Sequence, residues 1–333
     1  MDSIDIIKLA RSLIDIDSTS GRETEACNWL GSWLRDRNYQ VVEQPVANDR
    51  FNIIATLDSP PDVVFSTHID CVPPFFPSRE ENGLLFGRGA CDAKGILAAQ
   101  LAALERLRLD GEHRVALLVV VGEERGSQGA RAANTRPLGS RYLINGEPTE
   151  NKLGAATRGV YRTRLVAHGR AAHSSHPELG ESAIEKLLDA LLKLRDLPLP
   201  QDPLLGSTYY TVGLMSGGLA PNVVPPNAEA EVNFRTVGAA EEVRIALASL
   251  TSLVDLEAVV EVPPVTLETL SGFSTEVFPY TTDIPFLSAW GKPLLFGPGS
   301  VLVAHTDNEH VSVLEMIDSV EHYVTLAKRL LAN

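Results

Sequence analysis

Cysteine is scarce in this chain. Its 333 residues include three cysteines, Cys27, Cys71 and Cys91, and none of them forms a CxxC spacing. A disulfide framework is therefore not expected. This usage is typical of a protein from a reducing cytoplasm, which is where we expect the chain to be located.

Long apolar runs and basic charge are also lacking. No apolar segment approaches the roughly 20 residues that a membrane-spanning helix needs. The acidic, amphipathic start MDSIDIIKLARSLIDI does not resemble a secretory signal peptide, so export is not expected. The 29 Lys and Arg residues are outnumbered by 43 Asp and Glu residues, which gives a net charge of −14. This balance argues against nucleic acid and anionic membranes as partners and leaves carboxylates available for cations.

The sequence does contain an alternation of apolar strands and helices. The runs VVFST, VALLVVV and RYLIN are typical of buried strands, and KGILAAQLAALERLRL, between the first two, has helical spacing. Ser20 and Glu23 have the spacing of a capping box at the start of an earlier helix. The pattern predicts an α/β fold with a central mixed sheet flanked by helices.

The pattern of apolar and polar residues changes near Arg158. Alternating, half-exposed segments such as YRTRLVAHG and AEAEVNFRT follow, with helical segments between them. We expect a smaller α+β domain at residues 158–262, inserted between the two parts of the first domain, residues 1–157 and 263–333. After the insertion, PLLFG and VLVA are expected to return to the first sheet.

Polar side chains follow the predicted strands where each strand ends. The set comprises His68, Asp70, Glu123, Glu124, Glu147 and His305, together with Asp92 just ahead of the long helix. Taken singly, each is also typical of an ordinary turn or a solvated loop. Because the carboxyl ends of strands line the ligand crevice of an open α/β sheet, we expect these groups to converge.

Convergence of so many carboxylates requires positive charge. Buried, unpaired carboxylates cost several kcal/mol each by order of magnitude, and bound cations remove that cost. Imidazole and carboxylate ligands without a thiolate favour zinc or another divalent transition ion, and a shared carboxylate allows two ions to lie close together. Cys71 and Cys91 adjoin this set, but a role as small apolar fillers fits them better than a role as ligands.

The motifs as a set resemble a known enzyme family. In order and over nearly the whole chain, they are similar to the di-zinc metallopeptidase family that contains acetylornithine deacetylase, succinyl-diaminopimelate desuccinylase, aminoacylase and glutamate carboxypeptidase. The matching segments are HIDCVPP, GRGACDAKG, VVVGEERGSQG, INGEPT, GRAAHSSHPELG, NVVPP with NFR, and FGPGSVLVAHTDNEHV. Each motif alone is short enough to occur by chance.

The resemblance implies two divalent metal ions per chain, with Zn²⁺ expected and Co²⁺ as an alternative. His68 and Glu147 would hold one ion, and Glu124 and His305 would hold the other. Asp92 would bridge both ions.

The resemblance also implies catalytic roles for two further acids. Glu123, beside the ligand Glu124, would be the general base. Asp70 would orient the imidazole of His68 through the second ring nitrogen.

The inserted domain would contribute substrate contacts. His173 matches the histidine that stabilises the oxyanion in the family, and His176 is its nearby rival. Asn222 and Arg235 match positions that touch the substrate, and the guanidinium of Arg235 is suited to bind a carboxylate. Four more arginines on the first strand of this domain are more typical of a solvated edge; they are Arg158, Arg162, Arg164 and Arg170.

The resemblance predicts a metal-dependent amidohydrolase that removes an N-acyl group from an amino acid. The segment FGPGS favours an N-acetylornithine-like substrate. A succinyl-diaminopimelate desuccinylase and a metallo-dipeptidase or carboxypeptidase remain alternatives because all share this machinery. A metallophosphatase fits the carboxylate-binding arginine less well, and a non-catalytic relative is expected to lack the base or a ligand. Dimeric relatives pair through the smaller domain, so we expect a homodimer and a substrate that is a small N-acyl amino acid or short peptide.

Overall fold

The computed structural model describes residues 4–332, and the chain divides into two compact units. The large unit comprises the described residues up to Ala155, then Leu267–Glu276, and the described residues from Thr282 onward. The small unit comprises Ala156–Thr266 and Val277–Thr281. The range expected for the insertion, 158–262, does not include this short return of the chain to the small unit.

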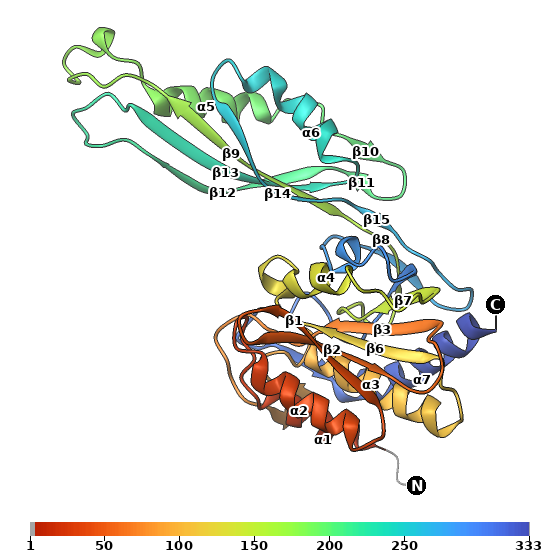
Figure 1. Ribbon diagram of the computed structural model, residues 1–333. Helices are drawn as coiled ribbons and strands as arrows, with labels where there is room; N and C mark the ends of the chain where they lie inside the picture. The colour runs from red at the N-terminus through yellow and green to blue at the C-terminus, as the bar shows by residue number, and fades with distance from the viewer. Residues whose placement is uncertain (1–3, 333) are drawn as a thin grey trace. The chain divides into compact units, whose positions relative to one another are not determined.

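A six-stranded mixed sheet lies at the centre of the large unit (Figure 1). Its strands, in order across the sheet, are β1 (Gln40–Ala47), β2 (Arg50–Thr56), β6 (Val115–Val120), β3 (Val63–His68), β7 (Tyr142–Asn145) and β17 (Lys292–Leu295). The four strands β6, β3, β7 and β17 are parallel, whereas β1 and β2 are antiparallel to their neighbours. The predicted α/β fold with a mixed central sheet is confirmed.

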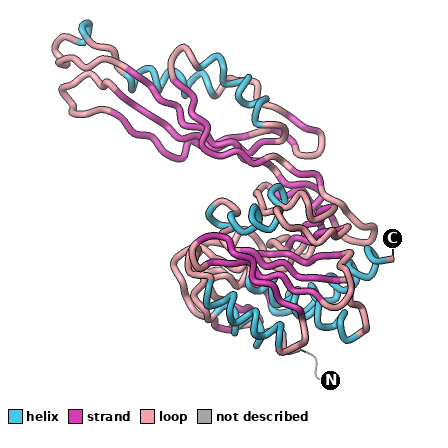
Figure 2. The backbone as a smooth tube through the Cα atoms, in the orientation of Figure 1, coloured by secondary structure: helices cyan, strands magenta, loops and turns pink. Residues whose placement is uncertain are grey.

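Helices cover both faces of this sheet (Figures 1 and 2). One face carries α1 (Ile6–Ile14), α2 (Thr24–Arg35), α3 (Lys94–Leu109) and α7 (Val313–Leu331), and the other carries α4 (Gln128–Ala133). Successive side chains of a strand point to opposite faces. Phe65 and Leu117 therefore enter the core under α3 and α7, whereas Val64 and Leu118 enter a second core with Trp290. Burial on both faces explains why these strands are continuously apolar.

Several short elements complete the large unit. A three-stranded sheet has the order β18 (His310–Ser312), β5 (Leu84–Phe86), β4 (Arg79–Glu81). The 3₁₀ turn η1 (Glu123–Arg125) follows β6, and the 3₁₀ turn η4 (Ile284–Phe286) precedes β17. A further three-stranded sheet, whose residues are divided between the two units, has the order β15 (Val265–Thr266), β8 (Leu153–Thr157), β16 (Thr275–Phe278).

The predicted capping box of Ser20 and Glu23 is wrong. Helix α2 has Glu23 at its N-cap, with no side-chain hydrogen bond to the cap. The hydroxyl of Ser20 instead donates to Asp70, and the carboxylate of Glu23 accepts from Arg50 at 2.6 Å. Both side chains therefore bind partners that are distant in the sequence instead of capping the helix.

The predicted strand VLVA is also wrong. Residues 301–304 form turns, and Leu302 is 82% exposed. His305, at the end of this stretch, has φ = +63°, in the left-handed region that a strand does not use. The loop between β17 and β18 therefore carries His305 outside the sheet.

The small unit has an antiparallel sheet with helices on one face (Figure 2). Its strands, in order, are β12 (Tyr209–Gly217), β13 (Asn227–Thr236), β9 (Gly159–His168) and β14 (Asp255–Val262), and the helices are α5 (Ala183–Leu194) and α6 (Ala240–Leu247). Burial alternates along β13, and Phe234 packs with Leu187 and Val243 in a separate core. The remaining elements are η2 (Pro177–Leu179), β10 (Gln201–Asp202), β11 (Gly206–Ser207) and η3 (Ala248–Leu250).

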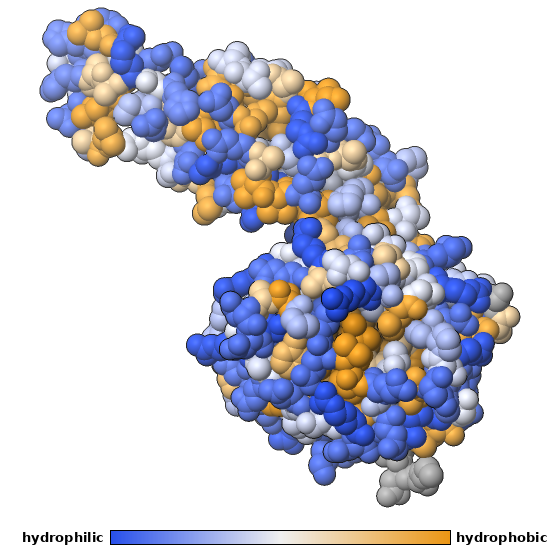
Figure 3. All heavy atoms as spheres, viewed as in Figure 1, coloured by the Kyte–Doolittle hydropathy of each residue, from blue (hydrophilic) through white to orange (hydrophobic). Residues whose placement is uncertain are grey.

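The face of the large unit that Figure 3 shows is mainly polar. Figure 3 shows hydrophilic residues over most of its visible surface, with smaller groups of apolar side chains between them. Of the helices formed by residues 4–332, none combines the length and the apolar composition that a membrane crossing requires.

Candidate metal centre

Five predicted ligands lie together in the large unit. His68 is the last residue of β3, and Glu147 follows β7 by two residues. Asp92 precedes the first residue of α3 by two positions. Glu124 lies in η1, which follows β6, and His305 lies in the loop after β17. The parallel strands thus deliver their ends to one edge of the sheet, as expected for this topology.

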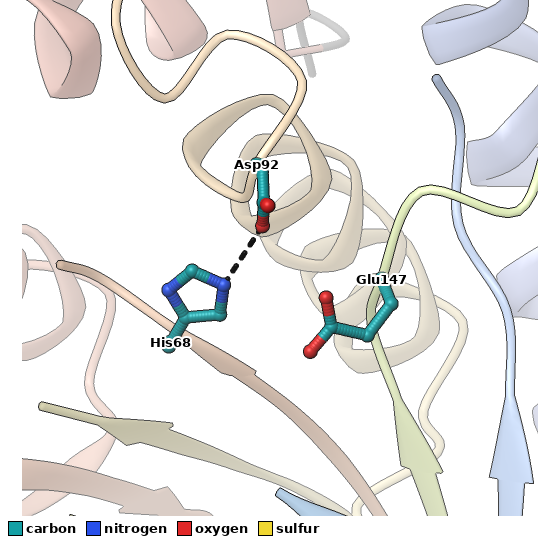
Figure 4. A group of neighbouring side chains, drawn as sticks. All are labelled: His68, Asp92 and Glu147. Carbon is teal, nitrogen blue, oxygen red and sulfur yellow. Dashed lines mark hydrogen bonds and ion pairs between the residues drawn. The ribbon is translucent and has the colours of Figure 1, made fainter. Parts of the chain in front are cut away.

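His68, Asp92 and Glu147 form the first of two ligand groups (Figure 4). One ligand atom from each lies within 4.8 Å of the others. The Nε2 atom of His68 is 2.9 Å from Oδ1 of Asp92, and the carboxylate of Glu147 faces this pair. The Oε1 atom of Glu147 is buried and has no hydrogen-bond partner among residues 4–332. An unpartnered carboxylate oxygen at this point suits a cation.

Asp92, Glu124 and His305 form the second group, within the same 4.8 Å limit. The Nε2 atom of His305 lies 2.8 Å from Oε1 of Glu124 and 3.3 Å from Oδ2 of Asp92. Asp92 therefore offers one oxygen to His305 and the other to His68. This is the arrangement that a bridging carboxylate requires.

Electrostatics of the cluster also favour a cation. Burial raises the pKa of Glu123, Glu124 and Glu147, and repulsion between neighbouring carboxylates raises each pKa further. Hydrogen bonds to Asp92 and Glu124 raise the pKa of His305 to about 10. Positive charge on imidazole thus offsets part of the acidic charge of the cluster. Divalent cations can supply that charge, and the set of imidazole nitrogens and carboxylate oxygens suits Zn²⁺ or Co²⁺.

Asp70 contacts both His68 and the turn that carries Glu123. The Nδ1 atom of His68 is 2.9 Å from the main-chain oxygen of Asp70 but 3.6 Å from its Oδ1. The carboxylate instead accepts from the backbone N–H of Glu123 at 3.0 Å and of Glu124 at 3.3 Å, and from the hydroxyl of Ser20 at 2.8 Å. The main-chain oxygen of Asp70 is therefore the nearer partner of the imidazole, and the role of its carboxylate in orienting His68 stays a prediction.

The turn before Glu123 depends on a glycine. Gly122 has φ = +74°, and an added Cβ would lie 2.5 Å from Nη2 of Arg50. A side chain at this position would be strained both by the backbone conformation and by contact. Gly122 thus allows the chain to turn directly from β6 into η1, where Glu123 is half-buried.

The cysteines near the site are not ligands in either group. Cys71 and Cys91 are fully buried, and burial raises the pKa of both thiols. Cys91 donates to the main-chain oxygen of Ser300 at 3.3 Å. A protonated, buried thiol fits the predicted role of apolar filler.

Two buried acids beside the site were not singled out from the sequence. Glu309 accepts hydrogen bonds from the loop that carries Asp92. Asp283 has no hydrogen bond of ordinary geometry within the described residues, and burial raises its pKa to about 6. The only available signals were the acid four residues after His305 in HTDNEHV and the acid in TTDIP. Such acids are more often solvated.

The small unit holds His173, Asn222 and Arg235. The loops of the first two meet, because His173 forms a β-bridge with Val223 and the N–H of Ser174 donates to the main-chain oxygen of Asn222. His173 is exposed, as its predicted role requires. The rival His176 lies 3.2 Å from the carboxylate of Glu178, two residues away.

Arg235 lies on β13 and is half-buried. In the part of the small unit that the structure describes, its guanidinium forms no hydrogen bond or ion pair, and burial lowers its pKa. The four arginines expected on a solvated edge all have partners; they are Arg158, Arg162, Arg164 and Arg170. Arg235 is therefore an unneutralised cation suited to a carboxylate ligand.

Known proteins resemble this chain at both the sequence and the structural level. Peptidase family M20/M25/M40 matches residues 64–332. A probable carboxypeptidase of Aspergillus terreus is 38% identical over 361 residues, covering 94% of this chain and 83% of the relative. A tripeptidase of Staphylococcus aureus has a TM-score of 0.85 at 19% identity, with 100% of each chain covered. The YXEP protein of Bacillus subtilis, a dinuclear metal-binding peptidase of the M20 family, has a TM-score of 0.73 at 15% identity, covering 98% of this chain and 97% of that one.

Proposed function

The chain belongs to peptidase family M20/M25/M40 and hydrolyses amide bonds, and we propose that it is a metallopeptidase acting on short peptides with a free carboxyl terminus. The observation that carries the proposal is the position of Asp92, which presents Oδ1 to His68 and Oδ2 to His305. One carboxylate thereby joins two ligand groups into one centre. The expected acetylornithine deacetylase branch of the family stays a prediction.

Two divalent cations, with Zn²⁺ preferred and Co²⁺ as an alternative, would be held by the two groups described above. The dinuclear metal-binding peptidase of Bacillus subtilis supports this number. Bound at these residues, divalent cations would supply Lewis-acid polarisation of the scissile carbonyl and positive charge near its oxygen.

Glu123 is the proposed general base. It adjoins Glu124 in η1, and its backbone is fixed by Asp70. Burial raises the pKa of Glu123, which makes its carboxylate a stronger acceptor for the proton of the attacking water. The same group would then return the proton to the leaving nitrogen. The presence of Glu123 beside all five proposed ligands argues against a non-catalytic relative.

The small unit is proposed to bind the substrate. The unpaired guanidinium of Arg235 would bind the terminal carboxylate, and Asn222 would contact the substrate nearby. His173 would donate a hydrogen bond to the oxyanion. The probable carboxypeptidase of Aspergillus terreus supports a substrate that carries a free carboxylate.

A second candidate function is removal of an N-acyl group from an amino acid. The segment FGPGS favours N-acetylornithine for this activity, because it resembles the deacetylase branch. The same metal centre, base and carboxylate anchor would serve both reactions. Only the group on the acyl side of the scissile bond differs between them.

A substrate panel tests both candidates. The zinc- or cobalt-loaded protein is assayed with dipeptides, tripeptides, N-acetyl amino acids including N-acetylornithine, and N-succinyl-diaminopimelate. Each substrate is paired with its carboxamide. We expect the greatest kcat/KM for a short peptide and a large loss on its carboxamide. Greater kcat/KM for N-acetylornithine would favour the second candidate, and no hydrolysis of any substrate would overturn both.

The small unit is also proposed to form a homodimer contact. Strand β12 lies at an edge of its sheet, so one side of its backbone has no neighbouring strand in that sheet. Leu214 and Met215 on this strand are 66% and 61% exposed. Pairing of two β12 strands would bury these side chains and extend the sheet across the dimer.

A further inference from the structure

Glu309 is a buried acid whose hydrogen bonds converge on one loop. Its side chain is completely buried, and its Oε1 atom accepts from the backbone N–H of Gly89 at 2.9 Å, of Cys91 at 3.2 Å and of Asp92 at 3.1 Å. Its Oε2 atom accepts from Nη1 of Arg88 at 2.6 Å. Four donors from residues 88–92 therefore fix one carboxylate.

This carboxylate belongs to the loop that carries His305. Glu309 follows His305 by four residues, and the next residue, His310, pairs with Phe86 across β18 and β5. The hydrogen bonds of Glu309 thus join the two segments that supply Asp92 and His305, which are far apart in the sequence. These same two side chains meet at 3.3 Å in the second ligand group.

We propose that Glu309 is a positioning residue that fixes Asp92 relative to His305 in the metal centre. The inference rests on the proposed metal centre and deepens it. The ion pair with Arg88 alone would neutralise the buried charge of Glu309. The three backbone hydrogen bonds also fix the conformation of the loop that ends at Asp92. They do so effectively because a charged acceptor makes shorter and stronger hydrogen bonds than a neutral one.

A matched control exists on α3. Glu105 is also a buried carboxylate, 5% exposed, and it is held by Nε and Nη2 of Arg108. It lies near the far end of the helix from Asp92 and makes no hydrogen bond to the ligand loop. Glu105→Gln therefore removes a buried charge from the same unit without acting on the metal centre.

The test measures cobalt binding in wild-type protein, Glu309→Gln and Glu105→Gln. The amide keeps the volume of Glu309 but loses its charge and turns one acceptor into a donor toward Arg88 or the loop. We expect the Kd for Co²⁺ to rise by about ten- to a hundredfold in Glu309→Gln, as for other partners of metal ligands. The visible spectrum of cobalt at saturation should also change, whereas Glu105→Gln should match wild type in both measurements.

Each alternative outcome is distinct. An unchanged Kd and spectrum in Glu309→Gln would overturn the positioning role, even if both variants lost stability equally. A weaker Kd with an unchanged spectrum would also overturn it, because it would indicate loss of charge alone. If Glu309→Gln does not fold, Glu309→Asp keeps the charge but shortens its reach, and it should change the spectrum. A wild-type protein that binds no cobalt would overturn the metal centre itself.

Discussion

The carboxylate of Asp70 holds the backbone of Glu123, with Oδ1 of Asp70 3.0 Å from the Glu123 nitrogen. The main-chain oxygen of the same residue contacts Nδ1 of His68 at 2.9 Å. One residue therefore positions a proposed ligand through its main chain and the proposed base through its side chain. Substitution of the side chain should separate these two effects.

Asp70→Asn should lower kcat by about ten- to a hundredfold while two metal ions per chain remain bound. The amide replaces an acceptor that makes charge-assisted hydrogen bonds, each worth roughly 1.5 to 3 kcal/mol. Metal content by atomic spectroscopy and steady-state kinetics check this. Ser20→Ala, which removes only one of the donors to Asp70, is the control and should change kcat by less than about fivefold. Loss of metal in Asp70→Asn would instead indicate that the carboxylate acts by positioning the proposed ligand His68.

Glu123→Gln should reduce kcat by at least about a hundredfold with metal content unchanged, because a general base contributes roughly 10² to 10⁴ in rate. Glu124→Gln, one residue away, should lose metal as well as activity. Parallel metal analysis and kinetics of the two variants separate the base from the ligand. Turnover by Glu123→Gln at the wild-type rate would contradict the role of Glu123 as general base.

Asp92→Asn should weaken the binding of both metal ions, since each oxygen of Asp92 faces a different ligand group. Glu147→Gln should mainly weaken one ion, because Glu147 belongs to one group. Calorimetric titration of the metal-free variants with zinc resolves the two sites. Two variants that each lose a single site to the same extent would exclude a bridging role for Asp92.

Arg235→Ala should cut kcat/KM by about ten- to a hundredfold on substrates with a free carboxyl terminus, which corresponds to roughly 1.5 to 3 kcal/mol for a charge-assisted contact. The matching carboxamides should lose much less. Arg162→Ala is a suitable control, because Arg162 is already paired with Glu231 at 3.3 Å. Equal losses on acid and carboxamide would show that Arg235 does not anchor the carboxylate.

Leu214→Glu should shift the protein toward the monomer in sedimentation velocity measurements, since it places a charge on the proposed dimer edge. Leu314→Glu on α7 is the control: both leucines are 66% exposed, but Leu314 belongs to the large unit. A monomeric wild-type protein, or equal behaviour of the two variants, would reject pairing through β12.

The central sheet could be predicted because burial on two faces restricts composition. Every residue of β6 is buried, and VALLVV has no polar position. His68 and Glu147 lie at or just after the ends of such strands, and they became candidate ligands through the full set of polar groups and the family resemblance. We expected the two side chains to lie close together because the carboxyl ends of parallel strands meet at the same edge of a sheet.

Local sequence failed where distant partners decide the structure. Ser20 and Glu23 have the local pattern of a capping box, but Asp70 and Arg50 offer them stronger contacts. The apolar segment VLVA looks like a strand, yet residues 301–304 form turns and His305 after them has a left-handed backbone conformation. Glu309 could not be singled out because Arg88 lies 221 residues earlier in the sequence.

The order of the ligands along the chain has a consequence for biosynthesis. His68, Asp92 and Glu147 all precede the inserted residues 156–266, whereas His305 follows them. During translation the residues of the first ligand group are therefore all synthesised before the insertion, and the ribosome must add the whole insertion before it reaches His305. Domains generally fold as units while the chain is made. Because α7 packs in the same core as β3 and α3, the metal centre should form only after the C-terminal segment has joined the large unit, and activity should appear no earlier.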